Sequence, residues 1–108
     1  IRLHAQKEPS SMQDAISELL TRIIRAARTP EELQTLLEGL LTPQELEEID
    51  HRWRLLCRLD EGWTQRDIAK DLGVSLGKIA RGSRLLKYGS PGFRDLVRRI
   101  RSEVGDAE

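Results

Sequence analysis

Helix signals of one kind recur along the whole chain. Apolar residues return every three or four positions, which is the spacing of the buried face of an amphipathic helix. Residues that can cap a helix stand before these runs, and Thr29-Pro30 and Thr42-Pro43 are the clearest examples. The alternation and the β-branched or aromatic runs that are typical of strands are nearly absent. The pattern therefore predicts an all-α fold with about six helices joined by short loops.

Capping residues and glycines set the expected limits of the helices. An N-cap side chain accepts a hydrogen bond from a free backbone N–H group, and glycine often ends a helix. The 108 residues leave room for one domain, so we expect a single helical domain over 11–108 and a flexible arm over 1–10. The predicted starts are Ser11, Thr29, Thr42, Thr64, Ser75 and Ser90, and the predicted glycine stops are Gly39, Gly62 and Gly73.

A leucine-rich stripe occupies residues 33–41. Leu33, Leu36, Leu37, Leu40 and Leu41 all fall within this short segment. A stripe so broad in a small chain needs a partner surface, and a second copy of the chain is the economical partner. We therefore predict a homodimer, and the alternative is an ordinary monomeric bundle.

Charge is segregated along a chain whose formal net charge is 0. Residues 31–50 contain seven acids and no base, whereas residues 51–101 contain thirteen bases and five acids. A neutral protein of this kind can still present a basic face, which favours a polyanionic partner. The alternative is two solvated faces of opposite charge that merely balance.

The segment 64–87 has the pattern of a helix-turn-helix. Ala69 provides a small residue where two short helices cross, and Gly73 stands at the sharp turn, where a left-handed backbone is costly for other residues. In this motif the second helix lies in the DNA major groove. The alternative is a helical hairpin with a chance resemblance. The positions expected to be buried between the two helices are Ile68, Leu72, Val74 and Ile79.

Exposed positions of this segment are expected to contact double-stranded DNA. Basic side chains neutralise phosphates, and the glycine in the first turn of the second helix lets the backbone approach closely. The predicted DNA-binding residues are Gln65, Arg66, Ser75, Leu76, Gly77, Lys78, Arg81, Ser83, Arg84 and Lys87.

At these residues the chain resembles the bacterial tryptophan-repressor family. The resemblance implies an intertwined, all-helical homodimer that binds a near-palindromic operator, represses transcription, and is controlled by L-tryptophan or a related aromatic co-repressor. It covers residues 41–100 in order, and the first forty residues match only as helices of suitable length. The motifs that carry it are Leu41-Thr42-Pro43, Arg52, Arg54, Gly62, Thr64-Gln65-Arg66, Ala69, Leu72-Gly73, Ile79, Arg81-Gly82-Ser83 and Lys87.

The resemblance also implies a ligand site. Two arginines flank the aromatic ring of the ligand in this family, and guanidinium planes suit that role. A family serine that holds the ligand's amino group corresponds to Leu85, which cannot accept a hydrogen bond, so the ligand is expected to be altered, to lack an amino group, or to be absent. The alternative for Arg52 is a salt bridge with Glu48, four residues earlier. The implied ligand-binding residues are Leu41, Thr42, Arg52, Arg81, Gly82 and Leu85.

Other kinds of site have little support. The chain has a single cysteine, Cys57, which favours a reducing, cytoplasmic location and is expected to lie in the core. The sequence shows no membrane-spanning segment and no cluster of residues with metal-binding spacing. No nucleophile and base stand in an arrangement that indicates an enzyme. The predicted function is therefore a sequence-specific transcriptional repressor. The alternative is a ligand-independent helical dimer of the same fold that binds DNA or another protein.

Overall fold

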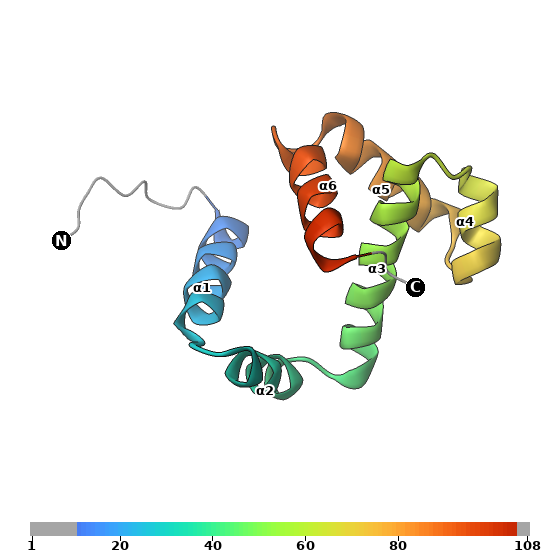
Figure 1. Ribbon diagram of the computed structural model, residues 1–108. Helices are drawn as coiled ribbons and strands as arrows, with labels where there is room; N and C mark the ends of the chain where they lie inside the picture. Colours follow the sequence, from blue (N-terminus) through green and yellow to red (C-terminus); the bar gives the residue numbers. More distant parts are fainter. Residues whose placement is uncertain (1–10, 106–108) are drawn as a thin grey trace. The chain divides into compact units, whose positions relative to one another are not determined.

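In the computed structural model, residues 11–105 are described, and they form six α-helices without a β-strand (Figure 1). This confirms the predicted all-α fold. The predicted arm over residues 1–10 lies outside the described residues. The helices are α1 (Met12–Ala26), α2 (Pro30–Leu40), α3 (Pro43–Glu61), α4 (Gln65–Leu72), α5 (Leu76–Tyr88) and α6 (Phe93–Val104).

The chain divides into two compact units, Ile1–Thr42 and Pro43–Glu108. The first unit contains α1 and α2, and the second contains α3 to α6. That residues 11–108 form one domain stays a prediction.

Four of the predicted helix starts are confirmed by side-chain caps. The hydroxyl oxygens of Ser11, Thr29, Thr64 and Ser75 each accept a hydrogen bond from the backbone N–H three residues later, at 3.1 to 3.2 Å. Such a cap stabilises a helix by about 1 kcal/mol. These caps place the starts of α1, α2, α4 and α5 where the sequence predicts them.

Two predicted limits are wrong. Gly39 does not stop α2, which continues to Leu40, because the restricted backbone before Pro43 ends the helix instead. The last helix begins at Phe93 rather than at Ser90. Pro91 and Gly92 lie at the centre of a turn that the Phe93 N–H closes onto the Ser90 carbonyl at 3.1 Å. Gly92 has φ +85°, and this position of a type II turn requires glycine or asparagine.

The core of the second unit lies where α3, α4 and α5 meet. Leu55, Ile68 and Ile79 are buried there, one from each helix. Full burial of one such side chain contributes about 1.5–3 kcal/mol. Gly73 ends α4 with φ +68°, as predicted for the turn of a helix-turn-helix. The partly buried residues around this core are Leu59, Ala69, Leu72 and Val74.

Arg58 of α3 contacts the loop before α4 through a cation–π contact and α4 itself through an ion pair. The Arg58 guanidinium lies 4.9 Å from the centre of the Trp63 ring, and its Nε lies 3.5 Å from Oδ2 of Asp71 on α4. Trp63 therefore acts as an anchor in the loop between α3 and α4. In Figure 1, α3 lies between α4 and α6, and it packs against both.

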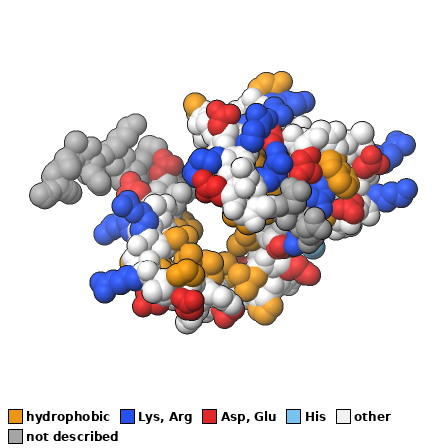
Figure 2. Space-filling view, viewed as in Figure 1, with side chains coloured by type: hydrophobic (Ala, Val, Ile, Leu, Met, Phe, Trp, Pro, Cys, Tyr) orange, Lys and Arg blue, Asp and Glu red, His pale blue; other side chains and the backbone are white. Residues whose placement is uncertain are grey.

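The first unit carries an apolar surface. Neither α1 nor α2 contains a buried residue, and Figure 2 shows hydrophobic side chains gathered over these helices. The exposed large apolar residues of α1 and α2 are Met12, Ile16, Leu19, Leu20, Ile24 and Leu40.

Candidate nucleic-acid interface and ligand cavity

The predicted DNA-binding residues lie on α4, on α5 and on the turn between these helices. All are exposed except Ser83, which is half-buried. Leu76 in the first turn of α5 is 59% exposed, which is high for a leucine. Next to it, a Cβ atom built on Gly77 would meet only the Ser75 hydroxyl, at 3.9 Å. The first turn of α5 therefore leaves its backbone open to close approach.

The cations of α4 and α5 have no acidic partners among residues 11–105. None of the six forms an ion pair within residues 11–105, and none is buried. Unpaired surface cations are the feature that backbone phosphates of DNA require. These residues are Arg66, Lys70, Lys78, Arg81, Arg84 and Lys87.

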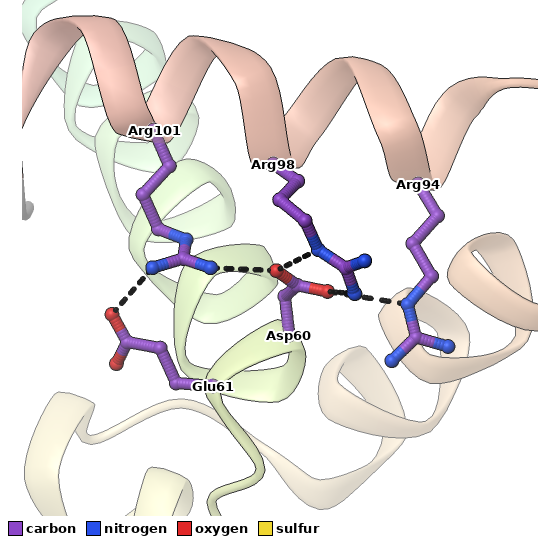
Figure 3. A network of polar contacts seen from close by, with 5 residues as sticks. All are labelled: Asp60, Glu61, Arg94, Arg98 and Arg101. Carbon is purple, nitrogen blue, oxygen red and sulfur yellow. Dashed lines mark hydrogen bonds and ion pairs between the residues drawn. The ribbon is translucent and has the colours of Figure 1, made fainter.

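The arginines of α6 behave differently. Three of them reach from α6 toward Asp60 on α3, as Figure 3 shows. Nη2 of Arg98 and of Arg101 each lie 2.7 Å from a carboxylate oxygen of Asp60, and Arg94 Nε lies at 3.2 Å. Arg101 also contacts Glu61 at 3.4 Å. Within residues 11–105, the cations of α4 and α5 are therefore unpaired, whereas those of α6 are paired with acids.

Asp60 is the charge centre of this cluster. Its side chain is only 1% exposed. Hydrogen bonds from Arg98 above all, and then from Arg101 and Arg94, hold the pKa of its carboxyl well below the ordinary value, although burial acts in the opposite direction. Sequence reasoning missed the cluster. The one available signal was the spacing of Arg94, Arg98 and Arg101, which places them on one face of a helix.

Four of the implied ligand-binding residues surround one cavity. Arg52 on α3 and Arg81, Gly82 and Leu85 on α5 line a space of about 180 Å³. This volume is below the roughly 300–1,000 Å³ of pockets for drug-sized ligands, and it suits a molecule of amino-acid size. Leu41 and Thr42 belong to the first unit, and their part in a ligand site stays a prediction.

Three further residues line the cavity that sequence reasoning did not assign to it. They are Leu55 and Leu56 on α3 and Lys78 on α5. Lys78 was predicted only as a DNA contact. It is the third residue of α5, one turn before Arg81, so the two side chains lie on the same side of the helix.

The alternative partner for Arg52 is not in place. Within residues 11–105, Arg52 forms no ion pair, and the helical pair on this part of α3 is Arg54 with Asp50 at 2.9 Å. Glu48 lines a separate, smaller space of about 30 Å³, together with His51, and Arg52 and Lys78 border both spaces.

Gly82 allows α5 to approach α3. A Cβ atom at this position would lie 2.8 Å from Cδ2 of Leu55 and 3.3 Å from Cδ1 of Leu59. Gly82 is buried and lines the cavity. Because it has no side chain, α5 can pack closely against α3 at this position.

A comparison with family models matches residues 15–101 to the Trp repressor protein family. The match extends from α1 to α6 and includes the helix-turn-helix and the cavity. The chain belongs to the Trp repressor family.

Curated relatives of this Trp repressor family member agree. A Trp operon repressor homolog of Mannheimia succiniciproducens is 39% identical over 72 residues, which cover 66% of this chain and 71% of the relative. Homologs with the same description from Chlamydia caviae and Vibrio parahaemolyticus are 34% and 33% identical, over 73% and 79% of this chain and 79% and 84% of those relatives. No solved structure matches significantly.

Family membership settles the general role of the chain. It is a helix-turn-helix, DNA-binding transcriptional repressor. The family consists of regulatory DNA-binding proteins rather than enzymes. In the part of the chain that the structure describes, no helix is both long and apolar enough for a membrane span, and no cluster of three or more His, Cys, Asp or Glu is placed to hold a metal.

Proposed function

We propose that this repressor binds a near-palindromic DNA operator as a homodimer, through α4 and α5 of each protomer, under the control of an aromatic small molecule such as L-tryptophan. One observation carries the proposal most directly. The cations of α4 and α5 are exposed and unpaired within residues 11–105, whereas those of α6 are neutralised by acids. Free cations on the helix-turn-helix supply the affinity for DNA phosphates.

We assign recognition of the DNA base sequence to the first turn of α5. Gly77 admits the DNA backbone or a base edge close to the helix, and the exposed Leu76 offers apolar contact to a thymine methyl group. Arg66 and Gln65 open α4, where free backbone N–H groups also favour a phosphate. Arg84 and Lys87, farther along α5, extend the phosphate contacts.

The proposal of a homodimer is based on the apolar surface of the first unit. A chain that leaves six large apolar side chains of α1 and α2 exposed gains stability when a second copy covers them. Two recognition helices related by a two-fold axis then require an operator with two-fold symmetry. Its half-sites are expected about one helical turn, or ~34 Å, apart.

Ligand control is assigned to the cavity between α3 and α5. A molecule in this cavity contacts α3 with one side and the recognition helix with the other, through Arg52 and Arg81. Its binding energy therefore depends on the position of α5 relative to α3. A ligand that binds one such position more tightly shifts the protein toward it.

Selection from a random duplex library tests the proposal. Sequences retained by the protein are expected to be near-palindromes, and their affinity is expected to fall steeply as salt is raised. Enrichment of an asymmetric site, or binding that is insensitive to salt, would contradict the geometry. Selections with and without L-tryptophan separate this function from a second candidate, ligand-independent DNA binding, which Leu85 favours.

The cytoplasmic location stays a prediction.

A further inference from the structure

Helix α6 carries a row of cations that the proposed function does not use. Arg94, Arg98 and Arg101 are spaced four and three residues apart, which places them on one face of the helix, and we call them the arginine row. The side chains of Arg94 and Arg98 are 46% and 55% exposed. If such a row were free, it would neutralise phosphates of any DNA, because phosphate contacts carry no sequence information.

Asp60 occupies the donor groups through which the arginine row would hold a phosphate. Nε and Nη2 of Arg98 donate to the two oxygens of the Asp60 carboxylate, at 3.1 and 2.7 Å (Figure 3). Nη2 of Arg101 donates to Asp60 at 2.7 Å, and its Nη1 donates to Glu61 at 3.4 Å. A phosphate that approaches the row therefore meets a carboxylate at its centre, and two acids offset much of the positive charge.

Stability alone is a weak explanation for this carboxylate. The Asp60 side chain is 1% exposed, and burial of a charge costs free energy that ion pairs only partly return. Buried ion pairs can often be replaced by apolar residues of similar volume without a loss of stability. An apolar residue at position 60 could therefore pack between α3 and α6 as well, and it would leave the arginine row free to bind phosphates.

The arginine row and the first helix of the helix-turn-helix lie on different sides of α3. In Figure 1, α3 lies between α4 and α6, and it packs against both. A duplex held by a free arginine row would approach a different side of the second unit from a duplex held by α4. This would add a mode of binding that reads no bases. Specific recognition depends on the ratio of operator affinity to the affinity for competing sites, so this second mode would lower specificity.

We propose that Asp60 is a specificity-determining residue, which neutralises the arginine row of α6 and so confines the binding of duplex DNA to α4 and α5. This inference rests on the proposed function, because it takes α4 and α5 as the DNA-binding surface. Asp60 keeps its negative charge at neutral pH, since hydrogen bonds from Arg98 above all hold the pKa of its carboxyl well below the ordinary value.

Removal of the charge at position 60 tests the inference on a labelled duplex of arbitrary sequence. Asp60→Asn and Asp60→Leu both free the arginine row, and the leucine leaves no buried amide that needs a partner. Titrations of the full chain are expected to give a slope of log affinity against log salt that is steeper by ~0.9 for each arginine that gains a phosphate. If Arg94 and Arg98 gain one each, the affinity for this duplex is expected to rise about tenfold at low salt.

The operator obtained by selection provides the second readout. Its affinity is expected to stay nearly the same in both variants, so that the ratio of operator affinity to affinity for the arbitrary duplex falls about tenfold. A merely structural role of Asp60 would weaken binding to both duplexes and would not steepen the salt dependence. Circular dichroism at the temperature of the titrations establishes which variants are folded, and the leucine variant decides if the asparagine variant is not.

Glu38→Gln is the matched control for net charge. Glu38 is exposed on α2 and accepts a hydrogen bond from Nε2 of Gln34 at 3.1 Å, so this change removes one negative charge without releasing an arginine. It is expected to leave the salt slope on the arbitrary duplex unchanged. Arg98→Gln is expected to change neither affinity in the unaltered protein, and to reverse part of the gain in slope when it is combined with Asp60→Leu.

Two results would overturn the inference. The first is a salt slope that is unchanged in the folded Asp60 variants. The second is that Arg98→Gln weakens the unaltered protein as strongly as Arg84→Gln does, which would show that Arg98 holds a phosphate beside Asp60. Arg84→Gln scores the proposed function separately, because it alters α5 and leaves the Asp60 cluster in place, whereas the Asp60 variants leave the cations of α5 in place.

Discussion

Gly82 on α5 lies so close to Leu55 on α3 that a Cβ atom at position 82 would come within 2.8 Å of Leu55 Cδ2. Leu55 is 4% exposed and belongs to the core that joins α3, α4 and α5. The two residues therefore set the distance between the helix that carries Arg52 and the helix that carries Arg81.

A comparison of two glycines on α5 tests this relationship. Gly82→Ala is expected to destabilise the protein by about 1–2 kcal/mol, because displacement of Leu55 outweighs the helix propensity that alanine adds. Gly77→Ala on the same helix meets only the Ser75 hydroxyl, at 3.9 Å, and is expected to stabilise the protein by roughly 0.5–1 kcal/mol. Urea unfolding measures both. Equal effects of the two substitutions would show that Leu55 moves aside without cost.

Local chemistry explains which parts of the fold were predictable. A cap such as Ser75 depends on one hydroxyl and the backbone N–H three residues later, so the sequence alone locates it. Gly39 was misread because glycine ends a helix only where the surrounding chain requires it, and here Pro43 sets the limit. Ser90 was misread as a cap because Pro91 and Gly92 together specify a turn.

Long-range contacts explain what was missed at the site. The Asp60 cluster joins residues 34 to 41 positions apart, so the spacing of the three arginines on α6 could not identify Asp60 as their partner. Lys78 was assigned to DNA because its charge and its place in the first turn of α5 are local facts. Its place on the cavity depends on how α5 packs against α3. The resemblance grouped Arg52, Arg81, Gly82 and Leu85, which line one cavity, because it carries packing information that single residues do not; that this cavity binds a ligand stays a prediction.

The buried carboxylate of Asp60 predicts a pH-dependent stability. Asp60→Asn is expected to lower the free energy of unfolding by about 2–3 kcal/mol at neutral pH. This is less than the ~3–5 kcal/mol for a fully buried pair, because Arg94 and Arg98 are about half exposed. Urea unfolding measures it, and Glu103→Gln, which removes the exposed partner of Arg99 on the same helix, is the control with little expected change.

The sign of the pH effect follows from the lowered pKa of Asp60. The folded state keeps this carboxylate charged at pH values where the unfolded state binds a proton. Its contribution is therefore complete above the ordinary pKa of ~3.9 and is lost as the pH falls through the lower, folded value. The difference between the unaltered protein and Asp60→Asn is expected to shrink below about pH 4. A difference that stays constant in acid would show that Asp60 is not held in its charged form by the arginines.

DNA affinity is expected to distinguish the unpaired arginines from the paired ones. Arg84→Gln removes an exposed cation of α5 that has no ion pair within residues 11–105, whereas Arg99→Gln removes one that Glu103 holds at 3.0 Å. Arg84→Gln is expected to weaken DNA binding, because one phosphate contact is lost in each protomer. The slope of log affinity against log salt is expected to fall by ~0.9 for each phosphate that is no longer neutralised, and therefore by twice that in a dimer. Arg99→Gln is expected to change neither. Titrations at several salt concentrations measure both slopes, and equal slopes would place the interface elsewhere.

The apolar face of α1 predicts how the chain assembles. Ile16 and Leu19 are 51% and 53% exposed, and no residue of α1 is buried. If a second copy covers this face, Leu19→Asp places a charge in an apolar interface, which is costly unless the charge is paired. Sedimentation at micromolar concentration is expected to give twice the chain mass for the unaltered protein and a lower average mass for Leu19→Asp. Because association stabilises the folded state, the melting temperature of the unaltered protein is expected to rise with concentration.

Thr21→Asp is the matched control, since Thr21 is exposed on the same helix and its hydroxyl donates only to the Ser17 carbonyl, at 2.9 Å. A folded protein of single chain mass, with a melting temperature independent of concentration, would contradict the dimer and with it the expected two-fold symmetry of the operator.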